Sequence, residues 1–172
     1  RLSREQYRRK MDPLFLAEIK TCYEDFYLIP EGGAGVLGAQ GFADYADAVT
    51  AQLEKQNLHI DSVWLPAGTG TSVAGLAARW HNVHAVGALA LQDPSAYKRE
   101  IHSWTDKLCG ARPIHPVKWH GFDGRFGRIT ASIIDICRSF YDQTGVLLDP
   151  IYGGKVLLAL QKAFDQGLHN QH

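Results

Sequence analysis

The stretch LPAGTGTSVAGLAARW, residues 65–80, is the sequence feature that most restricts the fold. An apolar run stops at Pro66, a turn of glycine and hydroxyl residues follows, and a helical pattern begins directly after it. A strand that passes through a tight turn into a helix is the basic unit of α/β proteins. The rest of the chain repeats this alternation. Strands are predicted at 26–30, 59–67 and 85–91, and helices at 4–24 (with a break near 11–13), 38–56, 72–82, 94–108, 129–144 and 155–166.

This order predicts an α/β fold with an open, mostly parallel twisted sheet and helices on both faces. The run AVGALAL at 85–91 is continuously apolar, as expected for a parallel strand that is buried on both sides. The segment around 113–122 is irregular or contains a short strand. Only about three strands are convincing, whereas sheets usually have about five or six. We therefore expect residues 1–172 to form part of a larger fold.

Composition and charge exclude several classes of function. The chain has 45% hydrophobic and 21% charged residues, a mixture typical of soluble globular domains. Its formal net charge is zero, and no basic stripe indicates nucleic-acid binding. No apolar run approaches the roughly 20 residues of a membrane span. The cysteines Cys22, Cys109 and Cys137 are widely spaced and fit no zinc motif, so we expect reduced thiols and a cytoplasmic location. A metal site is not predicted, because the pair His81 and His84 lacks a third ligand.

The turn formed by Gly68, Thr69, Gly70, Thr71 and Ser72 is a candidate phosphate-binding loop. The first amides of a helix have no partner within the helix, and the helix dipole adds partial positive charge there. Glycines allow close approach of an anion, and the hydroxyls add hydrogen-bond donors. The turn lacks the lysine of a Walker loop, the third glycine of a dinucleotide fingerprint and the closing glycine of a nucleophile elbow. It therefore indicates a monophosphate, with a capped structural turn as the alternative.

Two further turns carry candidate site residues. The segment 31–38 is glycine-rich and also joins an expected strand to a helix, so the two turns are predicted to border one crevice at the carboxyl ends of the strands. A purely structural turn is the alternative. The segment LLDPIYGGK, 147–155, places Tyr152 just before a helix, where it can act as an exposed acid or base or simply pack.

Taken together, these three segments resemble the carboxyl-terminal part of a family of pyridoxal-phosphate enzymes. It is the family of 1-aminocyclopropane-1-carboxylate deaminase and D-cysteine desulfhydrase, which has the tryptophan-synthase-β-like fold. YLIPEGGAGVLGAQGF resembles the family's IP-x-GG segment, AGTGTSVAGL its phosphate loop, and GVLLDPIYGGK its LDP-x-Y segment. The likeness covers essentially the whole chain.

The resemblance implies roles for several residues. Gly68, Thr69, Gly70, Thr71 and Ser72 would hold the phosphate of pyridoxal 5'-phosphate, and Tyr152 would lie near the reacting carbon and amine of the substrate. The loop 120–126 would line the site. One departure concerns Gly153, because the family has glutamate or threonine there, near the pyridine nitrogen of the cofactor. Another concerns the segment 32–35, where two polar side chains of the family's GGSN are missing.

The resemblance also implies what the chain lacks. Family members are about twice as long and carry the Schiff-base lysine in an Asn-Lys pair within an amino-terminal segment. This chain has eight lysines, and none follows an asparagine. We expect residues 1–172 to be the carboxyl-terminal part of the large cofactor-binding domain, inactive without the amino-terminal part.

The predicted function is a pyridoxal-phosphate-dependent deaminase or lyase that acts on a small amino acid and releases ammonia and a 2-keto acid. A homodimer is expected, without nucleic acid or membrane as a partner. The alternative is a non-catalytic or regulatory pyridoxal-phosphate-binding relic, which Gly153 favours. A serine or threonine dehydratase is a third possibility, against which the LDP-x-Y segment argues.

Overall fold

The computed structural model describes residues 2–23, 25–80, 83–89, 95–110, 117–120 and 127–167. The elements, in chain order, are α1 (Arg4–Arg8), α2 (Pro13–Cys22), the 3-10 turn η1 (Glu31–Gly33), α3 (Val36–Gln56), β1 (Ser62–Ala67), α4 (Thr71–Arg79), β2 (His84–Leu89), α5 (Ser95–Cys109), β3 (Lys118–His120), α6 (Ala131–Thr144) and α7 (Gly153–Asp165). The alternation of strands and helices from β1 onward confirms the α/β class.

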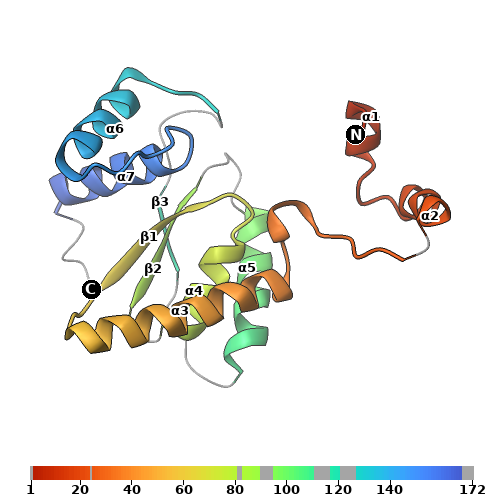
Figure 1. The fold of residues 1–172 in the computed structure, drawn as a ribbon, viewed down its shortest axis with the longest axis horizontal. Helices are drawn as coiled ribbons and strands as arrows, with labels where there is room; N and C mark the ends of the chain where they lie inside the picture. The colour runs from red at the N-terminus through yellow and green to blue at the C-terminus, as the bar shows by residue number, and fades with distance from the viewer. Residues whose placement is uncertain are drawn as a thin grey trace.

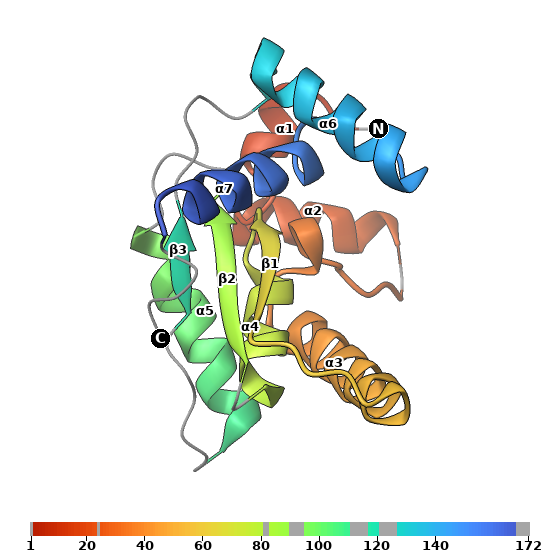
Figure 2. The ribbon, with the colours of Figure 1, turned by 90° about the vertical axis from the view of Figure 1, so that its left-hand side faces the viewer.

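The described strands form one parallel sheet in the order β1-β2-β3. Ser62 lies opposite His84 at the start of the β1–β2 pair, and Ala67 lies opposite Leu89 at its end. Figures 1 and 2 show this sheet between two layers, with α3, α4 and α5 on one side and α6 and α7 on the other. All three strands therefore end at the same edge of the sheet, where the loop after β1 begins.

Small residues allow α3 and α4 to pack closely against each other. Ala39, Ala43 and Ala46 of α3 are fully buried, as are Val73 and Ala74 of α4. Gly75 shows how close the approach is, since a Cβ atom placed on it would lie 2.2 Å from a backbone oxygen of α3. This layer holds the start of α4 in a fixed place relative to the sheet.

The core between this layer and the sheet joins residues of β1, α4 and α5. It includes Leu65, Leu76, Trp80 and Ile101, each at most 9% exposed. A buried threonine of α5, Thr105, donates its hydroxyl to the carbonyl of Ile101 at 2.8 Å, so its polar group is satisfied.

The amino-terminal region stands apart from the sheet (Figure 1). α1 begins with a capping box on Ser3, and Asp12 caps α2, so the predicted break between two helices is confirmed. An ion pair between Lys10 and Glu31 links this region to η1. No helix among the described residues has the length and apolar character needed to cross a membrane.

The predicted strand at 26–30 is wrong: its described residues form no strand and pair with none of the three strands. Its aromatic and branched side chains favour an extended backbone, but strand formation also requires a neighbouring strand. Tyr27 and Ile29 are more than 70% exposed. An apolar groove of about 540 Å³ lies along this segment and the start of α3.

Candidate functional site

The candidate site lies at the carboxyl edge of the sheet, where the chain leaves β1. β1 ends at Ala67, and α4 begins only four residues later at Thr71. Gly70 takes a left-handed conformation, with φ 81° and ψ 2°, at the residue before the helix. A Cβ atom on Gly70 would lie 2.0 Å from Cδ1 of Ile101, so only glycine fits both the backbone and the space.

The start of α4 leaves its first amides open. No side chain caps the helix, and the first helical hydrogen bond runs from the amide of Ala74 to the carbonyl of Gly70 at 3.0 Å. The amides of Thr71, Ser72 and Val73 precede that bond, so they have no acceptor within the helix. Partial positive charge at this helix end favours an anion.

Two hydroxyls stand beside these amides. Oγ1 of Thr69 and Oγ1 of Thr71 are 2.9 Å apart, and one of them donates to the other. Thr71 is only 4% exposed, so its hydroxyl is held in one place. A pair of hydroxyls linked in this way can turn one hydrogen outward toward an acceptor, such as a phosphate oxygen.

The glycine-rich turn at 31–38 packs directly on the loop at 68–72. A Cβ atom on Gly32 would lie 2.8 Å from Cγ2 of Thr69, and one on Gly38 would lie 2.9 Å from Cγ2 of Thr71. Gly32 also has a positive φ of 64°. Side chains at these two positions would push the turn away from the phosphate loop, so the glycines set the close approach.

Tyr152 reaches the loop at 68–72 from the layer of α6 and α7, on the other side of the sheet. It is the residue before α7, is 38% exposed, and its Cε1 would lie 4.0 Å from a Cβ atom on Gly68. A cavity of about 490 Å³ joins the three segments. It is lined by Glu31, Gly32, Phe42, Pro66, Gly68, Thr69, Gly70, Thr71, Ser72 and Tyr152. The predicted crevice between the two glycine-rich turns is therefore present, and all six predicted site residues border it.

The start of α7 differs from that of α4 because a carboxylate already occupies it. Asp149 accepts hydrogen bonds from the amides of Ile151, Tyr152 and Gly153 at 2.7–2.9 Å. Partial desolvation by itself raises the pKa of Asp149, but these three amide hydrogen bonds outweigh it and hold the pKa below its usual value. Of these two helix starts, only that of α4 therefore offers open amides to an anion in the cavity.

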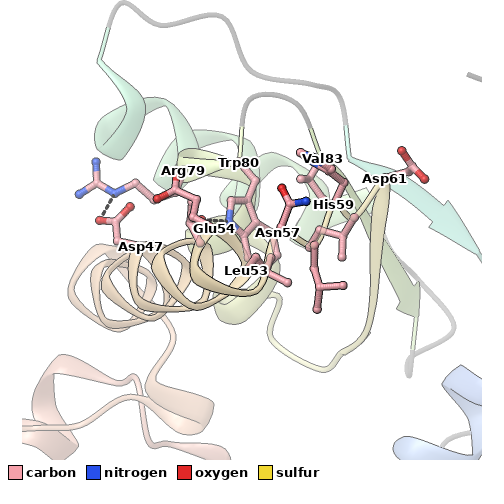
Figure 3. Close-up of a pocket in the computed structure, with 12 residues that line it drawn as sticks. Asp47, Leu53, Glu54, Asn57, His59, Asp61, Arg79, Trp80 and Val83 are labelled. Carbon is pink, nitrogen blue, oxygen red and sulfur yellow. Dashed lines mark hydrogen bonds and ion pairs between the residues drawn. The ribbon is translucent and has the colours of Figure 1, made fainter.

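A second, larger cavity lies at the opposite edge of the sheet (Figure 3). It measures about 810 Å³ and borders the chain before β1 and before β2. Two pairs of its polar residues are in contact: Nε of Arg79 lies 3.3 Å from Asp47 in an ion pair, and Nε1 of Trp80 donates to Thr50 at 2.9 Å. The carboxyl ends of α3 and α4 and three carboxylates border it, so it disfavours an anion.

Sequence reasoning did not single out Glu31 or Asp149. Glu31 follows Pro30 directly and begins the glycine-rich turn at 31–38. Asp149 precedes the start of α7 by four residues. The spacing of an acidic residue just before a helix was the available signal for Asp149. The predicted lining loop 120–126 lies outside the described residues, apart from the backbone of His120. No group of three or more metal-ligating side chains occurs in the part of the chain that the structure describes.

The fold and the cavity define an α/β protein with a loop of open amides and hydroxyls at the carboxyl edge of a parallel sheet. Comparisons with known proteins agree with the family resemblance. The chain is 28% identical over 151 residues to a putative 1-aminocyclopropane-1-carboxylate deaminase of Pyrococcus abyssi, covering 82% of this chain and 46% of the relative. It is 28% identical over 144 residues to a bifunctional D-cysteine desulfhydrase/1-aminocyclopropane-1-carboxylate deaminase of Arabidopsis thaliana, covering 78% and 35%. No family model matches the chain.

A solved structure described as an ACC deaminase homologue has the same fold. It superposes with a TM-score of 0.83 at 23% identity, covering 96% of this chain and 53% of that one. The chain thus spans less than half the length of the curated relatives named above.

Proposed function

We propose that this chain binds the phosphate of pyridoxal 5'-phosphate at 68–72 and supplies part of the active site of a deaminase or desulfhydrase. The substrate would be a small amino acid of the 1-aminocyclopropane-1-carboxylate or D-cysteine type, and ammonia and a 2-keto acid would be released. The observation that carries the proposal is the single cavity in which the open start of α4, the turn at Gly32 and Tyr152 meet. The names of the relatives support the same reaction class.

The residues present fit the phosphate end of the cofactor. Open amides at 71–73 and the hydroxyls of Thr69 and Thr71 offer donors to a dianion, and Gly68 and Gly70 let the backbone approach it. When bound, the cofactor supplies an electron sink for bonds broken at the amino acid's α-carbon. Tyr152 borders the same cavity and would hold or move a proton on the substrate side.

We further propose that the Schiff-base lysine comes from polypeptide outside residues 1–172. Lys155, the lysine nearest the site in sequence, is 1% exposed within the first turn of α7. The exposed apolar segment 26–29 and its groove of about 540 Å³ support a covering segment, which the relatives have room for in their remaining length. The proposed fold is accordingly the carboxyl-terminal part of the tryptophan-synthase-β-like architecture. The family resemblance further implies that the protein assembles as a homodimer.

Cofactor titration tests the binding step. We would add pyridoxal 5'-phosphate to the complete natural polypeptide and follow its absorbance and fluorescence. Thr71→Val should weaken binding at least tenfold, because it removes one hydroxyl from the loop. Thr50→Val, the same chemical change at the opposite cavity, should leave cofactor affinity within twofold. Equal losses in the two variants would contradict phosphate binding at 68–72.

A substrate panel tests the reaction. Keto-acid and ammonia release would be measured with small D- and L-amino acids and with 1-aminocyclopropane-1-carboxylate, using wild type and Tyr152→Phe. Turnover that depends on Tyr152 supports the enzyme. Cofactor binding without any turnover would instead favour the regulatory or relic alternative, for which the missing side chain at Gly153 is the specific observation.

A further inference from the structure

Asp149 accepts hydrogen bonds from the backbone amide of Tyr152 and from those of its neighbours. Its Oδ1 accepts the amides of Ile151 at 2.9 Å and Tyr152 at 2.7 Å, and its Oδ2 accepts the amide of Gly153 at 2.9 Å. Its own carbonyl accepts the amide of Gly154 at 2.7 Å. Four consecutive amides therefore point at one residue, which fixes the turn from 149 to 154.

The neighbouring glycine leaves room for this arrangement. A Cβ atom on Gly153 would lie 3.2 Å from Oδ2 of Asp149, closer than about nine in ten real Cβ contacts. A side chain there would therefore require the carboxylate to shift by a few tenths of an ångström. The charge of Asp149 also complements the positive end of the α7 dipole.

The fixed turn places Tyr152 at the phosphate loop. Tyr152 contributes no capping side chain to α7, and its backbone lies at φ −112° and ψ −65°, just outside the helix. With its own amide and both neighbouring amides held by Asp149, its Cα cannot move without breaking these bonds. The ring is thereby kept beside Gly68 at the edge of the cavity.

From these contacts we infer that Asp149 is a positioning residue that sets the place of Tyr152 relative to the phosphate loop. The catalytic consequence rests on the proposed function, because it requires Tyr152 to act on the substrate. Asp149 itself touches neither substrate nor cofactor in this scheme. It acts only through the backbone of Tyr152.

Kinetics of the complete natural polypeptide give the first test, with wild type, Asp149→Asn, Tyr152→Phe and the double variant. Displacement of a catalytic group by about 1 Å can lower a rate roughly 100-fold. We expect Asp149→Asn to lower kcat 10- to 100-fold, with KM and the cofactor Kd within threefold of wild type. In the Tyr152→Phe background the same change should lower kcat less than twofold. An equal loss in both backgrounds would show that Asp149 does not act through Tyr152.

Amide hydrogen exchange gives a second test that needs no activity. Asp149→Asn should speed exchange of the amides at 152 and 153 at least fivefold at pH 7, since the side chain loses its charge and keeps only one of its two acceptor oxygens. Asp12→Asn, which alters the cap of α2 by the same chemistry, should leave them unchanged. Unaltered exchange in Asp149→Asn overturns the inference. Altered exchange in a protein that neither binds the cofactor nor turns over supports the inference and refutes the proposed function.

Discussion

Replacing Gly70 by alanine should destabilise the protein more than the same change at a left-handed glycine with open space around it. Gly70 has φ 81°, a conformation that costs an alanine about 1–2 kcal/mol. The added Cβ would also lie 2.0 Å from Cδ1 and 2.4 Å from Cγ1 of Ile101, far inside the contact distance of about 3.5–4.0 Å. Overpacking of this kind costs about 1–3 kcal/mol. Gly70→Ala should therefore lower the free energy of unfolding by about 2–5 kcal/mol.

Gly33→Ala is the matched control for this prediction. Gly33 has φ 64°, but a Cβ atom placed on it would meet nothing within 4 Å, so only the backbone cost of about 1–2 kcal/mol applies. Urea unfolding of wild type and the two variants measures the difference. If Gly70→Ala destabilises the protein no more than Gly33→Ala does, Ile101 does not press on the phosphate loop. In that case α5 does not limit the space at Gly70.

Three further measurements test the packing and the charges. Gly75→Ala should lower the free energy of unfolding in urea by about 1–3 kcal/mol, because the added Cβ atom would lie 2.2 Å from a backbone oxygen of α3. Gly41→Ala adds a Cβ atom in open space and should raise the free energy of unfolding by about 0.5–1 kcal/mol. Desolvation, and to a smaller extent the charge of Asp149, raises the pKa of Cys137. A thiol reagent should therefore modify the exposed Cys22 well before the buried Cys137. Equal rates of modification would contradict the packing around Cys137. The lowered pKa of Asp149 stabilises the fold above the unfolded-state pKa of about 3.9, and this stabilisation is lost as the pH falls through the lower folded-state value. Asp149→Asn should thus cost about 0.3–1 kcal/mol at pH 7, because it removes the negative charge at the start of α7, and close to nothing at pH 2. A cost that is the same at both pH values would refute the contribution of the charge.

The sequence was most informative where local chemistry alone determines structure. The turn at 68–72 required glycine, the break before Pro13 required a new helix start, and Gly145 ended α6 in a left-handed conformation. These features depend on residues within a few positions of one another. They were therefore visible as patterns without knowledge of the fold.

The sequence was least informative where structure depends on a distant partner. Residues 26–30 have the composition of a strand, but none of the three described strands lies beside them, and composition does not reveal that. The 1% exposure of Lys155 was equally hidden, since lysine is usually a surface residue. Gly32 and Thr69 are 37 residues apart in the sequence, and they lie close together only because α3 packs against α4. The predicted crevice is present, but for another reason than the one predicted: the turn at 31–38 follows none of the described strands and meets the loop at 68–72 because α3 packs on α4.

Restoring a side chain at Gly153 separates the two candidate functions. The resemblance places glutamate or threonine there, near the pyridine nitrogen, so a threonine could hydrogen-bond the ring where glycine cannot. Any side chain also crowds Asp149 at 3.2 Å and Leu148 at 3.4 Å, and alanine introduces this crowding without the hydroxyl. If the native protein is a relic that lost its ring partner, Gly153→Thr should gain at least tenfold in turnover over Gly153→Ala. If the native protein is an active enzyme adapted to glycine, both variants should lose activity to a similar degree, because both disturb the Asp149 turn beneath Tyr152. Gain of turnover by Gly153→Ala alone would contradict both accounts, since it adds crowding and no hydrogen bond.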